Sequence, residues 1–348
     1  MNPTSDIPKH ILILRFSSVG DVILTAPALE ALKTAWPTCR ITYAVKQSCA
    51  SLVRHNPHVD AIVALEPDEG VFHFARRLAE TSFDTLLDWH GKMRSRILRR
   101  LLPPTRQVVW CKREPGDNLP VRLALKPYRP KIMLADRYHL AVEELVGRSL
   151  PRGRLRYYLG PQDQHDADAI LRSANINLEQ PIVGMSPGAN WRTKRWPTQR
   201  FGGLAQRLIE QGLQVVINGS PDESALGRAL LQVAPKAVDL TGRANLTELG
   251  GIISRCSAFI ANDSGPMHMA RALGVPTLAF FGSTSLAQFE WEGHQALSLS
   301  LNCAPCHFYG RRLCPRGHMR CLLDIDVEQA WQGLQPLLQI TERRFVQA

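Results

Sequence analysis

A carboxylate, two hydroxyls and a glycine follow the first apolar segment, in the stretch Arg15-Phe-Ser-Ser-Val-Gly-Asp21. Gly20 permits a tight turn and close backbone approach, and Ser17 and Ser18 can hold an oxygen-rich ligand. A carboxylate in this place can take the proton of an attacking hydroxyl group, which makes Asp21 a candidate general base. Asp21 can instead cap the following helix without doing chemistry, and the sequence leaves both interpretations open.

A second polar cluster, Asn262-Asp-Ser-Gly-Pro-Met-His268, also follows a short apolar run. Ser264 or Asp263 can cap a helix whose first turn holds Pro266. The free N–H groups and the dipole of such a helix form an anion site suited to a diphosphate, and His268 can approach the same anion. Asp263 can accept hydrogen bonds from sugar hydroxyls. The alternative is an ordinary helix cap beside a surface histidine.

A third motif is the loop Ser186-Pro-Gly-Ala-Asn-Trp-Arg-Thr-Lys-Arg-Trp-Pro197. A ligand can approach the backbone at Gly188 and Ala189, and Lys194 offers a point charge for phosphate. Pro197 is suited to open the next helix. A basic surface loop without a ligand is the alternative.

Four cysteines lie close together near the end of the chain: Cys303, Cys306, Cys314 and Cys321. Four thiolates can hold a tetrahedral zinc ion, but the spacing C-x2-C-x7-C-x6-C matches no standard zinc finger. Reduced structural thiols or facultative disulfides are the other possibilities.

The elements that must position these motifs show a regular alternation. Short apolar runs, which predict buried parallel strands, are separated by longer amphipathic segments, which predict helices. One such helix is expected over 22–36. The expected strands cover 10–16, 40–45, 60–65, 84–88 and 107–110, and then 181–186, 213–218, 258–261 and 276–281.

This pattern predicts an α/β fold with two Rossmann-like, doubly wound parallel sheets. We expect an N-terminal acceptor-binding domain over 1–165 and a C-terminal nucleotide-sugar-binding domain over 166–325. The segment 326–348 is expected to form a helix that packs back on the N-terminal domain. Ligands of such sheets bind at the carboxyl ends of the strands, so two domains that face a cleft suit a two-substrate reaction.

Composition narrows the function class. The chain has 348 residues, of which 45% are hydrophobic and 21% charged, which is typical of a globular protein and not of a disordered one. No apolar run is long enough to cross a bilayer, and the N-terminus has no export signal pattern. No Gly-x-Gly-x-x-Gly, P-loop or nucleophile elbow is present, which argues against dehydrogenases, P-loop enzymes and α/β-hydrolases.

Positive charge is concentrated in one stretch. Residues 91–160 hold 17 of the 42 Lys and Arg residues but only 5 of the 31 Asp and Glu residues, so the whole net charge of +11 originates there. Nucleic acid, an anionic membrane face or a polyanionic substrate could explain this excess. A basic surface that only keeps the protein soluble is the alternative.

The motifs at 15–21, 186–197 and 262–268, in their order and spacing along the chain, resemble glycosyltransferase family 9. This family comprises the ADP-heptose:lipopolysaccharide heptosyltransferases of Gram-negative bacteria. The resemblance runs from about residue 10 to residue 335, and Asp88-Trp-His-Gly-Lys-Met-Arg-Ser95 is also similar to a segment of that family. It implies a GT-B fold and metal-independent, inverting transfer of heptose from ADP-heptose to Kdo or heptose of the lipopolysaccharide inner core. No cofactor is implied.

The resemblance also implies roles for individual residues. Asp21 corresponds to the proposed general base, and Lys194 to the lysine that contacts donor phosphate. Donor contacts are implied for Gly188, Ala189, Asp263, Ser264, Gly265 and His268, and Asp222 or Glu223 would contact the nucleoside. Acceptor contacts are expected from Ser17, Ser18, Gly20, His90, Lys92, Arg94 and Arg96.

The implied partners are an ADP-sugar, an anionic glycolipid precursor of lipopolysaccharide and the anionic inner face of the inner membrane, where a cytoplasmic, peripheral protein would work. Two other functions stay open. One is a GT-B relative that uses another nucleotide-sugar, such as a UDP-sugar transferase or epimerase. The other is a basic nucleic-acid-binding protein, although no recognised nucleic-acid motif is present and we expect no nucleic-acid partner.

Overall fold

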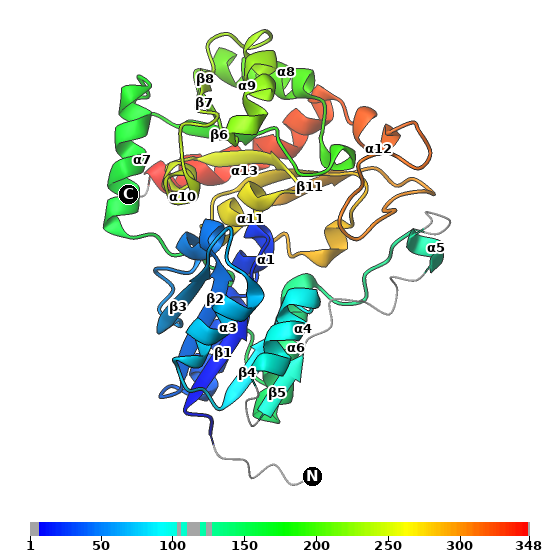
Figure 1. Cartoon of the computed structure of the whole chain (residues 1–348). Helices are drawn as coiled ribbons and strands as arrows, with labels where there is room; N and C mark the ends of the chain where they lie inside the picture. The colour runs from blue at the N-terminus through cyan, green and yellow to red at the C-terminus, as the bar shows by residue number, and fades with distance from the viewer. Residues whose placement is uncertain (1–6, 103–105, 110–118, 123–126, 347–348) are drawn as a thin grey trace. The chain divides into compact units, whose positions relative to one another are not determined.

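A computed structural model describes residues 7–102, 106–109, 119–122 and 127–346 (Figure 1). The chain divides into two compact units. Unit 1 comprises residues 1–114 and 132–158, and unit 2 comprises residues 115–131 and 159–348. The domain limit predicted at residue 165 lies inside helix α7, Pro161–Ser173.

Unit 1 is built on a five-stranded parallel sheet with the order β3-β2-β1-β4-β5. Its central strand has the burial that its apolar sequence predicts, since Ile11 to Leu14 are all at most 1% exposed. The strands are β1 (His10–Leu14), β2 (Arg40–Lys46), β3 (Ala61–Leu65), β4 (Thr85–Asp88) and β5 (Arg106–Val109). The helices are α1 (Val19–Ile23), α2 (Ala26–Ala35), the 3-10 helix η1 (Gln47–Leu52), α3 (Val71–Ala79), α4 (Met93–Leu101) and α6 (Leu134–Val146).

Unit 2 contains a six-stranded parallel sheet with the order β11-β10-β9-β6-β7-β8. Its strands are β6 (Ile182–Ser186), β7 (Gln214–Ile217), β8 (Val238–Asp239), β9 (Ala258–Asn262), β10 (Thr277–Phe281) and β11 (Gln295–Ser298). The α-helices, beside α7, are α5 (Leu119–Arg122), α8 (Thr198–Glu210), α9 (Ser224–Leu231), α10 (Leu246–Ser254), α11 (Gly265–Ala272), α12 (Arg320–Leu323) and α13 (Val327–Val346). Three short 3-10 helices are η2 (Arg192–Lys194), η3 (Pro221–Glu223) and η4 (Leu286–Gln288).

The α/β class with parallel sheets is therefore confirmed, with two differences in detail. The single helix expected over 22–36 is wrong, because the segment forms α1 and α2 with Pro27 in the first turn of α2. Proline has no backbone N–H to continue the earlier helix and is suited to a first turn. The edge strands β8 and β11 were not predicted, since they are short and half-exposed and lack a continuous apolar run.

The strand order of each sheet reverses at one place, between β1 and β4 in unit 1 and between β6 and β9 in unit 2. Leu14 is paired with Asp88, and Ser186 with Ala261, so the segments that follow these strands leave the same edge of their own sheet. Ligands of doubly wound sheets bind at this reversal, outside the carboxyl ends of the strands. Each unit thus brings its predicted motifs to the place where such a sheet binds a ligand.

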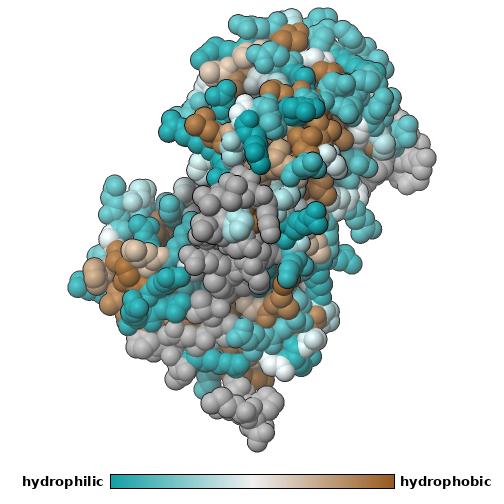
Figure 2. Space-filling model, turned by 90° about the vertical axis from the view of Figure 1, so that its right-hand side faces the viewer, coloured by the Kyte–Doolittle hydropathy of each residue, from teal (hydrophilic) through white to brown (hydrophobic). Residues whose placement is uncertain are grey.

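The C-terminal helix and the surface complete the fold. Helix α13 packs on α8 and on strands β9, β10 and β11 of unit 2, while its expected packing on the N-terminal domain stays a prediction. The face drawn in Figure 2 is mainly hydrophilic, with hydrophobic residues in separate patches. Within the described ranges, no helix combines the length and the hydropathy needed to cross a membrane.

Candidate functional site

The loop between β6 and α8 is anchored by a buried tryptophan. Trp196 is 1% exposed and stacks on Phe280 of β10 with 4.0 Å between the ring centroids. Its Nε1–H donates to the carbonyl oxygen of Ile325 at 2.9 Å. A stacked, hydrogen-bonded indole holds its backbone in place, and this fixes the position of Lys194 two residues earlier.

The side chain of Asn262 joins this loop to the end of β9. Its Oδ1 accepts from the backbone N–H of Trp196 at 2.9 Å, and its Nδ2 donates to the carbonyl oxygen of Pro187 at 2.8 Å. Asn262 is fully buried. One side-chain amide group therefore hydrogen-bonds to the backbone at both ends of the loop. Nothing in the local sequence marks Asn262 for this role.

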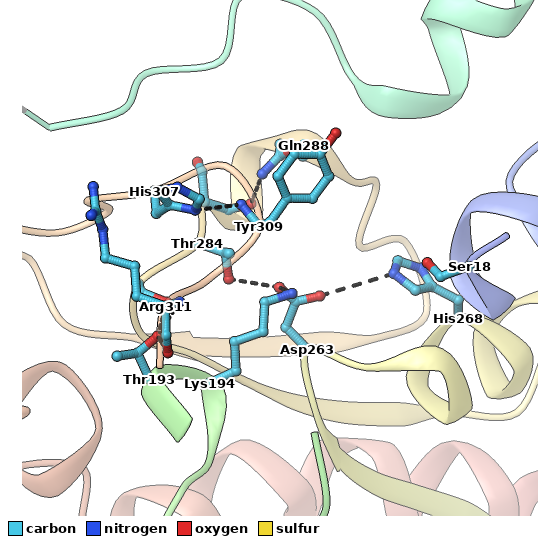
Figure 3. A network of polar contacts seen from close by, with 12 residues as sticks. Ser18, Thr193, Lys194, Asp263, His268, Thr284, Gln288, His307, Tyr309 and Arg311 are labelled. Atoms are coloured by element: carbon cyan, nitrogen blue, oxygen red, sulfur yellow. Dashed lines mark hydrogen bonds and ion pairs between the residues drawn. The ribbon is translucent and has the colours of Figure 1, made fainter. Parts of the chain in front are cut away.

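Asp263 is the centre of the polar network in unit 2 (Figure 3). Its Oδ2 is 2.7 Å from Nζ of Lys194 and accepts from Oγ1 of Thr284 at 2.6 Å, while its Oδ1 is 3.9 Å from Nε2 of His268. Burial alone would raise the pKa of Asp263, but the charges of Lys194 and His268 hold it below its ordinary value. The motifs at 186–197 and 262–268, far apart in sequence, thus meet at one ionised carboxylate.

The first turn of α11 offers donors beside this carboxylate. Ser264 is the N-cap in extended conformation, and Gly265 and Pro266 form the first two helical positions. The Ser264 side chain does not cap the helix, and its buried Oγ has no hydrogen-bond partner among the described residues. Unused N–H groups at a helix start attract anions, so this end of α11 can hold phosphate oxygens between Lys194 and His268.

A buried arginine supports the far side of His268. Arg271, on the next turn of α11, is 6% exposed, and burial lowers the pKa of its guanidinium to about 10. Its Cζ lies 5.6 Å and 4.8 Å from the ring centroids of Phe289 and Trp291, and its Nη2 donates to the carbonyl oxygen of Glu290. Phe289 in turn contacts the His268 ring, with centroids 4.9 Å apart. No motif in the sequence marks Phe289 and Trp291 as neighbours of His268.

The carboxylate of Glu223 lies against Gly188. A Cβ atom placed on Gly188 would lie 1.8 Å from Oε1 of Glu223, so no other residue type fits there without moving this carboxylate. Oε2 of Glu223 accepts from the backbone N–H of Ser220 at 2.9 Å, which closes a capping box on η3. Ala189 is buried and Asp222 is exposed. Of the two acidic candidates, Glu223 is thus the one beside the Gly188 backbone.

In unit 1, Asp21 both caps a helix and pairs with a buried cation. Its Oδ2 lies 2.6 Å from Nη2 of Arg15 and accepts from the Ser18 backbone N–H and hydroxyl at 3.2 Å and 2.9 Å. Arg15 is fully buried, and its Nη1 donates to the carbonyl oxygen of Trp89 at 2.8 Å. Gly20 is buried within α1. Ser18 is therefore the N-cap of α1, and Asp21 contributes to the capping box from the third helical position, inside the helix that it was expected to precede. The pairing with Arg15 is a contact that the motif alone did not reveal.

The predicted acceptor residues of unit 1 differ in exposure. Lys92, Arg94 and Arg96 are exposed at the start of α4, and Ser17 is half-buried. His90 is only 6% exposed, and its ring packs on Phe16 with centroids 5.0 Å apart. The cations can therefore meet a ligand from solvent, whereas little of the His90 side chain is open to solvent. Lys112 and Arg113 of the basic stretch lie outside the described residues.

The cysteine-rich segment gives no support to the zinc hypothesis. Cys303, Cys306, Cys314 and Cys321 are all free thiols. Cys303 is 3.6 Å from Nε2 of His318, but no three His, Cys, Asp or Glu side chains in the described part of the chain are placed to hold a metal ion. Burial, with the neighbouring thiols, raises the pKa of Cys321 to about 12, so the free thiol is protonated at neutral pH. A zinc site in this segment stays a prediction.

Comparison with known proteins decides the family. The profile of glycosyltransferase family 9 (heptosyltransferase) matches residues 71–315. This chain belongs to glycosyltransferase family 9. Membership of this family makes the chain a glycosyltransferase, as the resemblance of its motifs implied.

Relatives of this family 9 chain match over nearly its whole length. Lipooligosaccharide heptosyltransferase 2 of Haemophilus influenzae is 28% identical over 94% of the chain and 99% of the relative. Two solved structures share the fold. A family 9 glycosyl transferase of Veillonella parvula has a TM-score of 0.80 at 23% identity, covering 95% of this chain and 97% of that one. The ADP-heptose lps heptosyltransferase II of Escherichia coli has a TM-score of 0.76 at 20% identity, covering 96% and 99%. The expected GT-B class is confirmed by these neighbours.

Proposed function

We propose that this protein transfers heptose from ADP-heptose to Kdo or heptose of the lipopolysaccharide inner core, with inversion and without a metal ion. The observation that carries the proposal is the ionised Asp263, held by Lys194 at the start of α11, in a family 9 chain. The names of its relatives, which include ADP-heptose and lipopolysaccharide, support the choice of donor and acceptor.

The donor half of the proposal uses the unit 2 network. An ammonium group has three donors, so Lys194 can contact a diphosphate oxygen while Asp263 orients it. Together with the start of α11, this charge stabilises the ADP that leaves, which is the task a divalent ion performs in other transferases. We assign contacts with the donor sugar and the diphosphate to Asp263, Ser264, Gly265 and His268. The backbone of Gly188 and Ala189 contacts the donor as well, and Glu223 contacts its nucleoside.

The acceptor half uses unit 1. The acceptor oxygen attacks the anomeric carbon of heptose, the bond from that carbon to the diphosphate oxygen breaks, and ADP keeps the electron pair. Asp21 takes the hydroxyl proton during the attack. We assign acceptor contacts to Ser17, Ser18, the Gly20 backbone and the exposed Lys92, Arg94 and Arg96, whereas the buried His90 supports Phe16 instead of contacting ligand.

The partners follow from this assignment. An inner-core precursor carries carboxylates and phosphates on an anionic membrane, which suits the basic excess in residues 91–160. We therefore propose a cytoplasmic protein that works peripherally on the inner face of the inner membrane, without a nucleic-acid partner.

Nucleotide preference and turnover test the proposal. Thermal unfolding is measured with ADP, UDP, GDP and CDP, and a nucleotide at a hundred times its Kd should stabilise the fold by about 2.7 kcal/mol. We expect a selective response to ADP, and turnover of ADP-heptose that persists in EDTA. A selective response to UDP would discard heptose in favour of another nucleotide-sugar. Loss of turnover in EDTA would discard the metal-independent mechanism.

Gly188→Ala tests the nucleotide half of the site. The new methyl group must displace the Glu223 carboxylate. A hydrogen bond to a charged group contributes about 1.5–3 kcal/mol, so KM for the donor should rise by about tenfold or more with little change in kcat. Gly70→Ala is the matched control, because a Cβ there meets nothing within 4 Å. Equal KM values for the two variants would remove Glu223 from the donor site.

A further inference from the structure

A pocket in unit 2 lies outside the residues assigned to donor binding. It has a volume of about 720 Å³ and is formed by the loop 190–198 and by residues 312–323. Its apolar lining includes Trp191, Leu313 and Leu323. None of the residues assigned to the donor lines it. Figure 2 views the side on which Figure 1 draws α12, where hydrophobic residues lie among strongly hydrophilic ones.

The two walls of this pocket are joined by hydrogen bonds. Oγ1 of Thr193 donates to the carbonyl oxygen of Arg311 at 2.8 Å, and the Arg311 backbone N–H lies 2.7 Å from the same Oγ1. Thr193 is 2% exposed and also pairs with the hydroxyl of Ser283 at 2.9 Å. Gly310 lies close against the Trp191 side chain. The pocket is therefore a built feature of unit 2 and not a gap between two independent loops.

The lining of the pocket carries positive charge and no acidic side chain. The segments 186–201 and 303–323 contain eight Lys and Arg residues and no Asp or Glu. Arg192, Arg195 and Arg312 line the pocket. Nε of Arg195 donates to the carbonyl oxygen of Ala189 at 2.7 Å, whereas Arg192 and Arg312 make no side-chain hydrogen bond or ion pair with the described residues. Guanidinium groups bind phosphate oxygens in pairs of parallel hydrogen bonds, so these two arginines are available for an anion.

The same pocket exposes apolar surface. Trp191, Leu313 and Leu323 are 40%, 70% and 45% exposed. A free inorganic anion would leave this surface in water, whereas a ligand with a charged head and an apolar body would cover it. Exposed tryptophan and leucine side chains together with arginines are a combination found where proteins meet lipid headgroups.

We propose that this pocket binds a phosphate-bearing amphiphile, with the phosphate on Arg192 and Arg312 and the apolar part over Trp191 and Leu313. The ligand chemistry is that of an anionic phospholipid. The site is separate from the donor site, so the proposal does not depend on the transfer reaction.

Calorimetric titration of the full chain with dihexanoylphosphatidylglycerol, below its micelle concentration and with saturating ADP, tests the proposal. We expect saturable binding that is at least tenfold weaker in the double variant Arg192→Gln/Arg312→Gln. The control is Arg54→Gln/Arg148→Gln, two exposed arginines of unit 1, which should bind as the unchanged protein does. Unchanged binding by the first variant, or displacement of the lipid by ADP, would overturn the proposal.

Two further titrations separate the possible sources of the phosphate. Inorganic phosphate should bind at least tenfold more weakly than the phospholipid, and dihexanoylphosphatidylcholine should bind more weakly as well because its head carries no net charge. Leu313→Ser should weaken phospholipid binding without changing phosphate binding, and Leu140→Ser, an exposed leucine on α6, should change neither. Equal affinity for phosphate and phospholipid would make this an ordinary anion site and overturn the amphiphile assignment.

Discussion

Asp21→Asn is expected to lower kcat for heptose transfer by at least about a hundredfold, the usual effect of losing a general base. An amide cannot take the acceptor proton, while its oxygen can still accept the hydrogen bonds of Ser18. The variant should also lose stability. The buried Arg15 loses the charge of its partner, and a hydrogen bond to a charged group contributes about 1.5–3 kcal/mol. Steady-state kinetics well below the unfolding temperature separates the two effects.

Asp60→Asn is the matched control for this experiment. Asp60 is also a carboxylate of unit 1 that holds a cation, Lys33 at 2.7 Å, and a backbone N–H, that of Ile41 at 2.6 Å. Asp60 comes directly before strand β3, whereas Asp21 comes after strand β1, so Asp60 does not lie at the carboxyl ends of the strands, where ligands of such sheets bind. We expect Asp60→Asn to lower the unfolding temperature slightly and to keep normal kcat. A kcat for folded Asp21→Asn within threefold of the unchanged enzyme would leave Asp21 only its capping role.

Lys194→Met is expected to destabilise unit 2 by about 3–5 kcal/mol at neutral pH, as removal of one partner from a buried ion pair does. The substitution leaves the carboxylate of Asp263, which is 5% exposed, without the ammonium group 2.7 Å away. Chemical unfolding monitored by fluorescence measures the loss. Lys33→Met removes the partner of the half-exposed Asp60 and should cost less than about 1 kcal/mol.

The effect of Lys194→Met should depend on pH. Because the pKa of Asp263 is held below its ordinary value in the folded protein, the pairing contributes stability above the pKa of the unfolded chain. That contribution is lost as pH falls through the lower, folded pKa. In the variant, burial without the ammonium group raises the pKa of Asp263. Its carboxyl group is therefore protonated at a higher pH, and the neutral group destabilises the folded state less than the buried charge does. The stability difference between the two proteins should therefore begin to shrink above the ordinary carboxyl pKa of about 4, as pH falls through the raised pKa of the variant. It should stop shrinking below the lowered pKa of the unchanged protein. A difference that is constant with pH would rule out the charge of Asp263 as its cause.

The sequence predicted the strands that carry the site because parallel strands buried on both faces must be apolar almost throughout. It also predicted that the motifs at 186–197 and 262–268 share one sheet edge, since both follow such strands. The contacts that hold the motifs in place could not be predicted. Asn262 meets the N–H of Trp196 across 66 positions of sequence, and nothing local marks that pairing.

Side-chain burial was harder to predict than backbone placement. His90 stands among cations in the sequence, yet its ring turns inward because Phe16 of a neighbouring loop supplies an aromatic surface. Arg15 lies within the buried strand expected over 10–16, and Asp21 and the Trp89 carbonyl group make the burial of its charge possible. In both places, residues distant in sequence determine whether a polar side chain lies inside the protein.

The double attachment of Asn262 has a consequence for how quickly and how tightly the donor can bind. With both ends of the 187–196 loop held by one buried amide, the conformational entropy of ordering that loop is lost once, when the chain folds. Donor binding then does not have to repeat this loss, and a preorganised loop favours affinity. We therefore expect the two anchored ends of this loop to keep their places when the nucleotide enters.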